Sequence, residues 1–197
     1  MKPLNLFYPV KPWRLHQAFG ECTEGVCDKY KALGLEGHNG QDVWAPDGWI
    51  IHAAHDGVVT FSGEDGSGGL GVVIRTHDKR TYGTGEAYYK TIYWHLKRGS
   101  IFVRAGQSVA VGDVIALADN TGLSTGSHLH FSLKPVYQGE QEWDWMNAEQ
   151  NNGYRGAIDP ELYWSGLYAE DFASWRAQLT KIRLELEKLV LGFKRGA

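Results

Sequence analysis

Short runs in which apolar and polar positions alternate recur along most of the chain, and glycines separate them. The clearest runs lie at residues 49–54, 58–61, 70–76, 88–96 and 128–133. A period of two predicts β-strands, and we expect Asp56-Gly57 to form the hairpin turn between the first two runs. Residues 21–37 and 77–87 lack the pattern and are expected to be loops, and residues 136–156 to be an aromatic-rich insert. Short strands at this spacing predict a mainly β protein, a compact antiparallel sandwich or barrel.

The pattern changes near Tyr168. Apolar residues now recur at alternating steps of three and four: Phe172, Trp175, Leu179, Ile182, Leu186 and Leu189. This spacing predicts an amphipathic α-helix with a heptad-like stripe. We therefore divide the chain into a β domain over residues 1–165 and a C-terminal helix over residues 166–197. The stripe is short, so we expect the helix to pack against the β domain; self-association through residues 168–190 is the alternative.

Composition adds that the chain is an ordinary globular protein, with 43% hydrophobic and 22% charged residues. Its 25 glycines favour tight turns and hence a β-rich fold. The formal net charge of −3 does not indicate the positive surface that binds nucleic acid. No apolar run approaches the ~20 residues of a membrane span, and the first residues lack the apolar centre of a signal peptide. Cys22 and Cys27, the two cysteines, form either a small disulfide loop or free thiols.

The candidate chemistry centres on His128 and His130, which stand two residues apart in an alternating run. On a strand such residues face the same side, roughly 7 Å apart. Two imidazoles in this arrangement can bind a metal, relay a proton, or do one of each. A histidine pair on a solvated strand face is the alternative.

His38 and Asp42 form a second candidate pair, four positions apart. On a straight strand the two side chains would be roughly 13 Å apart, too far to share one zinc ion with bonds of about 2 Å. The Asn39-Gly40 dipeptide between them is a turn signal that permits positive φ. We expect a bend at this dipeptide to bring the imidazole and the carboxylate together.

The same spacing recurs at His52 and Asp56, but no glycine bends the chain between them. We therefore expect His52 and His55 to be ordinary strand residues or rim positions. His95 stands near the end of the run at 88–96, where alternation places it with Thr91 and Tyr93 on a polar face. It is a further candidate, and an ordinary surface histidine is the alternative. Trp94 is expected to lie in the core.

Taken in order, three motifs resemble those of the lysostaphin/LytM-type zinc metalloendopeptidases, which cut peptide bonds in bacterial peptidoglycan. They are Gly37-His38-x-x-x-Asp42, Tyr93-x-His95-Leu96 and His128-x-His130-Phe131. The Gly112-Asp113 turn and the Asn120-Thr121-Gly122 loop agree with this pattern. The resemblance covers roughly residues 7–135, and three motifs in the right order are far more specific than any one of them.

The resemblance implies a two-layer antiparallel β-structure, a duplicated hybrid motif, with the site in a groove. It implies that His38, Asp42 and His130 bind one zinc ion, and that His95 and His128 are the catalytic, non-ligand histidines. It further implies a peptidoglycan peptide as substrate and action on the cell wall. A chain without a leader fits a phage lysin or a virion-associated enzyme. Two alternatives stay open: a catalytically silent wall-binding or virion structural module with the same fold, and a histidine phosphocarrier.

Overall fold

The computed structural model describes residues 2–23, 25–139 and 145–195, and the side chains of the last stretch as far as residue 188. The strands are β1 (Leu6–Tyr8), β2 (Leu15–Gln17), β3 (Gln41–Trp44), β4 (Ile50–His52), β5 (Gly57–Asp65), β6 (Gly69–Thr76), β7 (Arg80–Tyr82), β8 (Gly85–Trp94), β9 (Ser108–Val109), β10 (Val114–Leu117), β11 (His128–Gln138), β12 (Trp145–Asn147) and β13 (Trp164–Tyr168). The helices are α1 (Cys27–Ala32), the 3-10 turn η1 (Glu161–Tyr163) and α2 (Ala169–Arg195).

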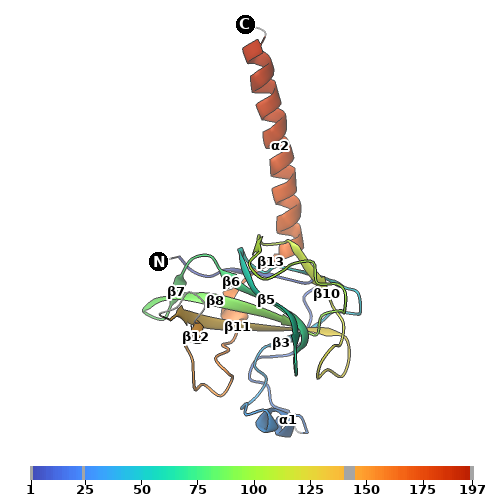
Figure 1. Ribbon diagram of the computed structural model, residues 1–197, viewed down its shortest axis with the longest axis vertical. Coiled ribbons are helices and arrows are strands. Elements are labelled where there is room, and N and C mark those ends of the chain that lie inside the picture. The colour runs from blue at the N-terminus through green and yellow to red at the C-terminus, as the bar shows by residue number, and fades with distance from the viewer. Residues whose placement is uncertain (1, 24, 140–144, 196–197) are drawn as a thin grey trace.

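One large sheet dominates the described residues, with the strand order β2-β3-β11-β8-β6-β5-β9. All of its pairings are antiparallel. The short strands β12 and β7 extend it beside β11 and β8, and β4 pairs with β10 in a separate two-stranded sheet. The prediction of a mainly β, antiparallel fold with a C-terminal helix is confirmed (Figure 1).

Alternation along the two central strands separates a core face from an outer face. Leu129, Phe131 and Leu133 of β11 are fully buried, as are Tyr89 and Tyr93 of β8. These side chains form one hydrophobic cluster with apolar residues of β1, β4, β5, β6 and β10. The residues between them on β11 face the other side, and that side carries the candidate site.

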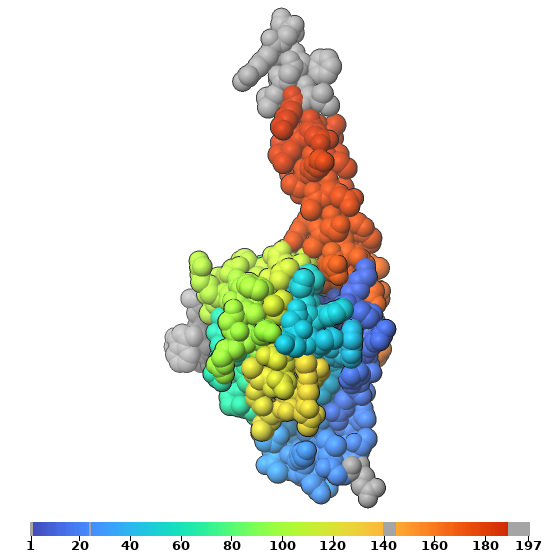
Figure 2. All heavy atoms as spheres, turned by 90° about the vertical axis from the view of Figure 1, so that its right-hand side faces the viewer, coloured from blue at the N-terminus to red at the C-terminus, as the bar shows by residue number. Residues whose placement is uncertain are grey.

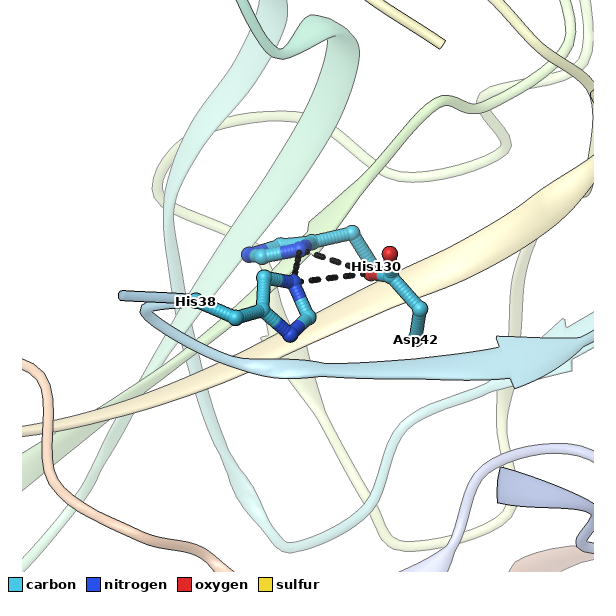
Figure 3. A group of neighbouring side chains, drawn as sticks. All are labelled: His38, Asp42 and His130. Carbon is cyan, nitrogen blue, oxygen red and sulfur yellow. Dashed lines mark hydrogen bonds and ion pairs between the residues drawn. The ribbon is translucent and has the colours of Figure 1, made fainter. Parts of the chain in front are cut away.

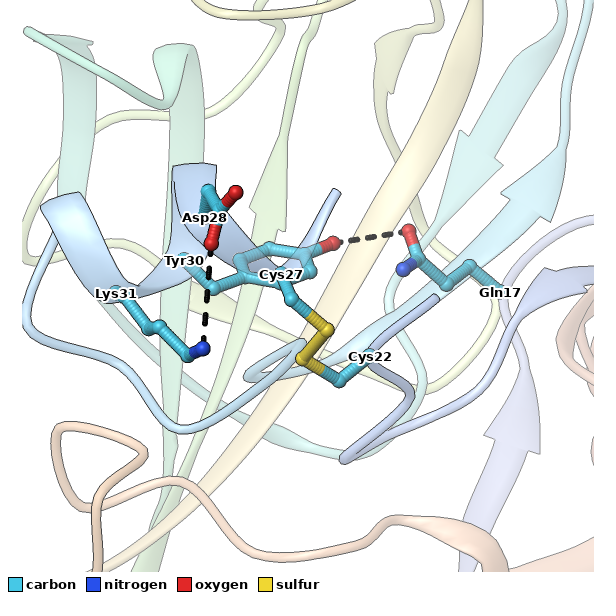
Figure 4. Close-up of a disulfide and its surroundings, with 6 residues drawn as sticks. All are labelled: Gln17, Cys22, Cys27, Asp28, Tyr30 and Lys31. Atoms are coloured by element: carbon cyan, nitrogen blue, oxygen red, sulfur yellow. Dashed lines mark hydrogen bonds and ion pairs between the residues drawn. A yellow bond between two sulfur atoms is a disulfide. The ribbon is translucent and has the colours of Figure 1, made fainter. Parts of the chain in front are cut away.

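Several local predictions were wrong. The Asp56-Gly57 hairpin does not form, because β4 pairs with β10 while β5 pairs with β6 and β9. The expected loop at 77–87 contains β7, which pairs with the start of β8. Residues 21–37 contain the short helix α1, which a disulfide between Cys22 and Cys27 ties to the preceding loop (Figure 4). In the insert, residues 145–147 form β12 against β11, and residues 140–144 lie outside the described residues.

Helix α2 begins at Ala169 and projects from the β domain as a single rod (Figures 1 and 2). Its first turns pack against the domain: the Phe172 ring lies 5.0 Å from that of Phe7, and Arg176 forms an ion pair with Asp113. The rest of the apolar stripe is exposed at Trp175, Leu179, Ile182 and Leu186, and the Leu189 side chain lies outside the described residues. The expectation that the helix packs against the β domain therefore holds only for its first turns. Among the described residues no helix is long and apolar enough to cross a membrane.

Candidate metal centre

Strand register brings the two histidine motifs together. In the antiparallel pair formed by β11 and β3, His130 lies opposite Asp42 and His128 lies opposite Trp44. Directly opposite residues share a face of the sheet, with Cβ atoms about 5 Å apart. His128, His130 and Asp42 therefore project from the outer face of the sheet, opposite the core.

The loop before β3 places His38 over this group. Gly40 makes the approach possible: a Cβ atom there would come within 2.7 Å of the His130 ring and 2.5 Å of the Phe131 carbonyl oxygen. We expected Gly40 to bend the chain through positive φ, but Gly40 is not among the glycines with positive φ. The bend forms with ordinary backbone angles, and glycine is needed there because the loop runs against β11 without space for a side chain.

Three ligand atoms converge on one point (Figure 3). The Nε2 atom of His38 lies 3.0 Å from Nδ1 of His130, and the Oδ1 atom of Asp42 lies 3.1 Å and 2.9 Å from these two nitrogens. Ligands of a tetrahedral zinc ion with bonds of about 2.0–2.1 Å lie about 3.3 Å from one another. The spacing of the three atoms therefore fits a single small cation, and the described residues hold this metal-binding group of His38, Asp42 and His130.

A backbone contact supports the ligand role of His38. Its Nδ1 atom lies 3.1 Å from the carbonyl oxygen of Ala18, which can only accept a hydrogen bond. The Nδ1–H therefore donates to Ala18, and Nε2 carries the lone pair that faces Asp42 and His130. Such outer contacts orient metal ligands in other proteins. Sequence reasoning did not find Ala18, since a carbonyl oxygen leaves no signal in the side-chain pattern.

His95 and His128 lie beside the metal-binding group with their ring centroids 4.6 Å apart. Alternation predicted His95 on the same face as Thr91 and Tyr93, and that was wrong because both of those residues are buried in the core. His95 follows the last residue of β8 with a φ of 63°, and this left-handed conformation takes it out of the strand's alternation. Its Nδ1 atom lies 2.7 Å from the Thr121 carbonyl oxygen, which fixes the ring.

The surroundings shift the pKa values of Asp42, His128 and His95 in different ways. Burial would raise the pKa of the Asp42 carboxyl, but contacts with three histidines outweigh burial and hold this pKa well below its usual range. Burial lowers the pKa of His128, but the Asp42 carboxylate, 3.5 Å from its Nε2 atom, raises it and prevails. Burial also lowers the pKa of His95, to about 4, and the Thr121 carbonyl offsets only part of this effect.

Three other residues considered in the sequence analysis, His52, His55 and Trp94, lie outside the metal-binding group. His52 and His55 are outside the metal-binding group, as expected, but both are buried rather than at a rim. The His55 ring is held by the Asp56 carbonyl oxygen and by the Thr91 hydroxyl. Trp94 is not a core residue: it lies opposite His130 on the outer face, against Gly68 and Gly71, and is half-buried.

An antiparallel sheet that carries a His-Asp-His metal group beside two further histidines is the arrangement expected of a metallopeptidase. The chain belongs to Peptidase family M23, whose model matches residues 36–144. Among named relatives, the DD-carboxypeptidase/endopeptidase Mpg of Neisseria meningitidis serogroup B is 39% identical over 97 residues, 49% of this chain and 20% of that protein. The peptidoglycan DD-endopeptidase ShyA of Vibrio cholerae serotype O1 is 38% identical over 127 residues, 64% of this chain and 26% of that protein.

Solved structures agree on the fold. The catalytic domain of the antimicrobial peptidase lysostaphin from Staphylococcus simulans superposes with a TM-score of 0.56 at 20% identity, over 77% of this chain and 91% of that one. A zinc containing peptidase from Vibrio cholerae gives a TM-score of 0.53 at 29% identity, over 75% of this chain and 39% of that one. The chain spans only about a fifth to a quarter of the length of the two curated relatives.

Proposed function

We propose that this M23 peptidase is a zinc-dependent endopeptidase that hydrolyses peptide bonds of bacterial peptidoglycan. The observation that carries the proposal is the convergence of His38, Asp42 and His130 on one point, with His95 and His128 beside it. Relatives named as peptidoglycan DD-endopeptidases support the substrate, and a similar structure named as a zinc containing peptidase supports the metal.

The donor set suits a catalytic zinc site. Two imidazoles and one carboxylate are three protein ligands, which leaves a fourth position open for water or substrate. A zinc ion held by them would polarise the scissile carbonyl group and lower the pKa of a water molecule. Asp42 stays ionised at any pH at which the protein works, because its pKa is held below its usual range.

We assign different roles to the two remaining histidines. His95 donates its Nδ1–H to Thr121, and its lowered pKa keeps the ring neutral near pH 7, so Nε2 is free to accept the proton of the attacking water. His128 donates its Nδ1–H to the Gly126 carbonyl oxygen and faces Asp42 with Nε2. The carboxylate favours the protonated form of His128, which can stabilise the oxyanion and pass a proton to the leaving amine.

Metal analysis combined with a wall-clearing assay tests the proposal. Wild type should bind about one zinc ion per chain and clear purified peptidoglycan, whereas Asp42→Ala should lose both. His77→Ala is the matched control, since His77 is exposed and outside the metal-binding group. Zinc binding without clearing of any wall type would favour the catalytically silent module. A wild type that binds no zinc even when supplied would contradict the metal assignment.

The division of the chain into a β domain and a C-terminal helix bears on how the protein assembles and where it acts. We propose that an endopeptidase domain is followed by a C-terminal appendage; the division predicted between residues 165 and 166 falls within β13, and α2 begins at Ala169. Because the exposed stripe of α2 has no partner among the described residues, we propose that this helix mediates self-association. With peptidoglycan as substrate the protein would act on the cell wall.

A further inference from the structure

Three positively charged side chains lie in a row across the centre of the large sheet. Lys134 of β11 is directly opposite Lys90 of β8, and Lys90 is directly opposite Arg75 of β6. Directly opposite residues project from the same face with Cβ atoms about 5 Å apart. Lys90, Lys134 and Arg75 therefore form a continuous row of cations, which we call the cation row.

The cation row lies on the same face of the sheet as the metal-binding group. His130 and Lys134 are four positions apart on β11, and residues separated by an even number on a strand share a face. The distance along the strand is about 13 Å. On β8 the same face carries Trp94 opposite His130, then Ile92, then Lys90.

Like charges directly opposite each other destabilise a sheet, and within the described part of the chain no ion pair with a carboxylate compensates them. None of the ion pairs among the described residues includes Arg75, Lys90 or Lys134. The Nε atom of Arg75 is buried without a hydrogen-bond partner, a costly state for a charged group.

Burial and neighbouring positive charges act on the pKa values of both lysines. Burial, together with the positive charges of Arg155 and Lys90, lowers the pKa of Lys134 to about 8. Burial and the charge of Arg75 lower the pKa of Lys90 as well. A nearby anion would stabilise the charged form of each lysine.

Aromatic rings hold the arginine in place without neutralising it. The Arg75 guanidinium carbon lies 4.1 Å from the centre of the Trp145 ring and 5.1 Å from that of Tyr88, and the Lys90 ammonium lies 5.7 Å from that of Trp145. Cation–π contacts of this kind orient a cation while leaving its charge available. The described structure thus contains a positioned and uncompensated set of cations at a fixed distance from the metal-binding group.

We propose that the cation row is a binding subsite for carboxylate groups of the peptide substrate, about four extended residues away from the bond that is cut. The inference rests on the proposed function for the identity of the substrate. An extended peptide advances about 3.3 Å per residue, so four residues of it match the distance along the strand between the metal centre and the row. Free carboxylates of a peptidoglycan peptide would supply the missing charge through charge-assisted hydrogen bonds.

Calorimetric titration of the zinc-loaded protein tests the subsite. The probes are an uncrosslinked peptidoglycan peptide with free carboxylates and the same peptide with every carboxylate amidated. Wild type should bind the free acid about tenfold more tightly, the value expected for one charge-assisted hydrogen bond. The double variant Lys90→Gln/Lys134→Gln should bind both forms alike, and Lys181→Gln on the exposed part of α2 should behave as wild type. The melting temperature of the double variant should equal or exceed that of wild type, because the repulsion is relieved.

Equal binding of the two peptides by wild type overturns the inference, as does a double variant that retains the preference. Equal binding is also the result expected if Glu140, Glu142 or Asp144, which lie outside the described residues, neutralised the row from within the chain. Hydrolysis of cross-linked peptidoglycan is measured separately. If the preference holds while no peptidoglycan is cut, the proposed function fails and the carboxylate subsite stands.

Discussion

The Nε2 atom of His38 lies 3.0 Å from the Nδ1 atom of His130, although 92 positions separate the two residues in the sequence. His130 is fixed by strand register, and His38 by a loop that runs back over β11. With the Asp42 carboxylate as the third member, the contact depends on backbone placement more than on any flexible side chain.

Replacement of Gly40 by alanine should weaken metal binding. A Cβ atom would meet the His130 ring at 2.7 Å and the Phe131 carbonyl oxygen at 2.5 Å, so the loop that carries His38 must move away. We expect at least a tenfold loss of zinc affinity, the lower end of the range for disturbed ligand support. Competition with a chromogenic chelator measures it. Gly66→Ala is the control, since a Cβ atom at Gly66 meets nothing within 4 Å; equal affinities for the two variants would contradict the prediction.

His95→Asn should separate catalysis from metal binding. Asparagine tolerates the left-handed backbone conformation that His95 adopts, at a φ of 63°, so the fold should survive. We expect the zinc content to stay at the wild-type value, while kcat on cross-linked peptidoglycan falls by about 10²–10⁴, the usual contribution of a general base. A loss of zinc in this variant would instead assign His95 to the metal-binding group.

The buried His55 should make stability depend on pH. Burial lowers its pKa to about 4 in the folded state, against about 6.5 in the unfolded chain. The unfolded state therefore binds more protons between these values, and the free energy of unfolding falls as the pH drops from about 6.5 to about 4. The loss is on the order of 3 kcal/mol, because burial disfavours the charged form of the ring.

Urea unfolding of wild type and His55→Gln with a chelator present, at pH 7, 6 and 5, tests this contribution. The chelator removes the effect of metal release, and the other histidines are common to both proteins. The stability advantage of wild type over the variant should narrow as the pH falls. An advantage that is the same at all three pH values would show that His55 does not titrate as described.

The exposed stripe of α2 should govern the oligomeric state. Leu179 and Leu186 are more than half exposed, at 66% and 56%, and lie on one helix face seven residues apart. Sedimentation of wild type should show a concentration-dependent dimer, and Leu179→Glu/Leu186→Glu should be monomeric with unchanged melting of the β domain. A monomeric wild type at all accessible concentrations would contradict self-association through the helix.

The sequence predicted the mainly β fold and the group of His38, Asp42 and His130 that the structure brings together, because histidine and aspartate motifs can be recognised along the chain. It placed Trp94 in the core because it took the face of Thr91 and Tyr93 for the polar one, whereas those two residues are buried. It misplaced His95 because the positive φ of this residue ends the alternation of β8. It also missed the role of Gly40, which depends on a strand distant in sequence. The cation row was invisible for the same reason: only the register of three strands makes neighbours of Arg75, Lys90 and Lys134.

Helix α2 has a geometric consequence for the enzyme. Its 27 residues extend for about 40 Å, and among its described side chains those of the first turns contact the β domain. A body bound to the far end would therefore be held away from the hydrolytic centre by a spacer of nearly fixed length. The ion pair between Arg176 and Asp113 would set the angle at which this spacer leaves the domain, and with it the region of a surface that the enzyme can reach.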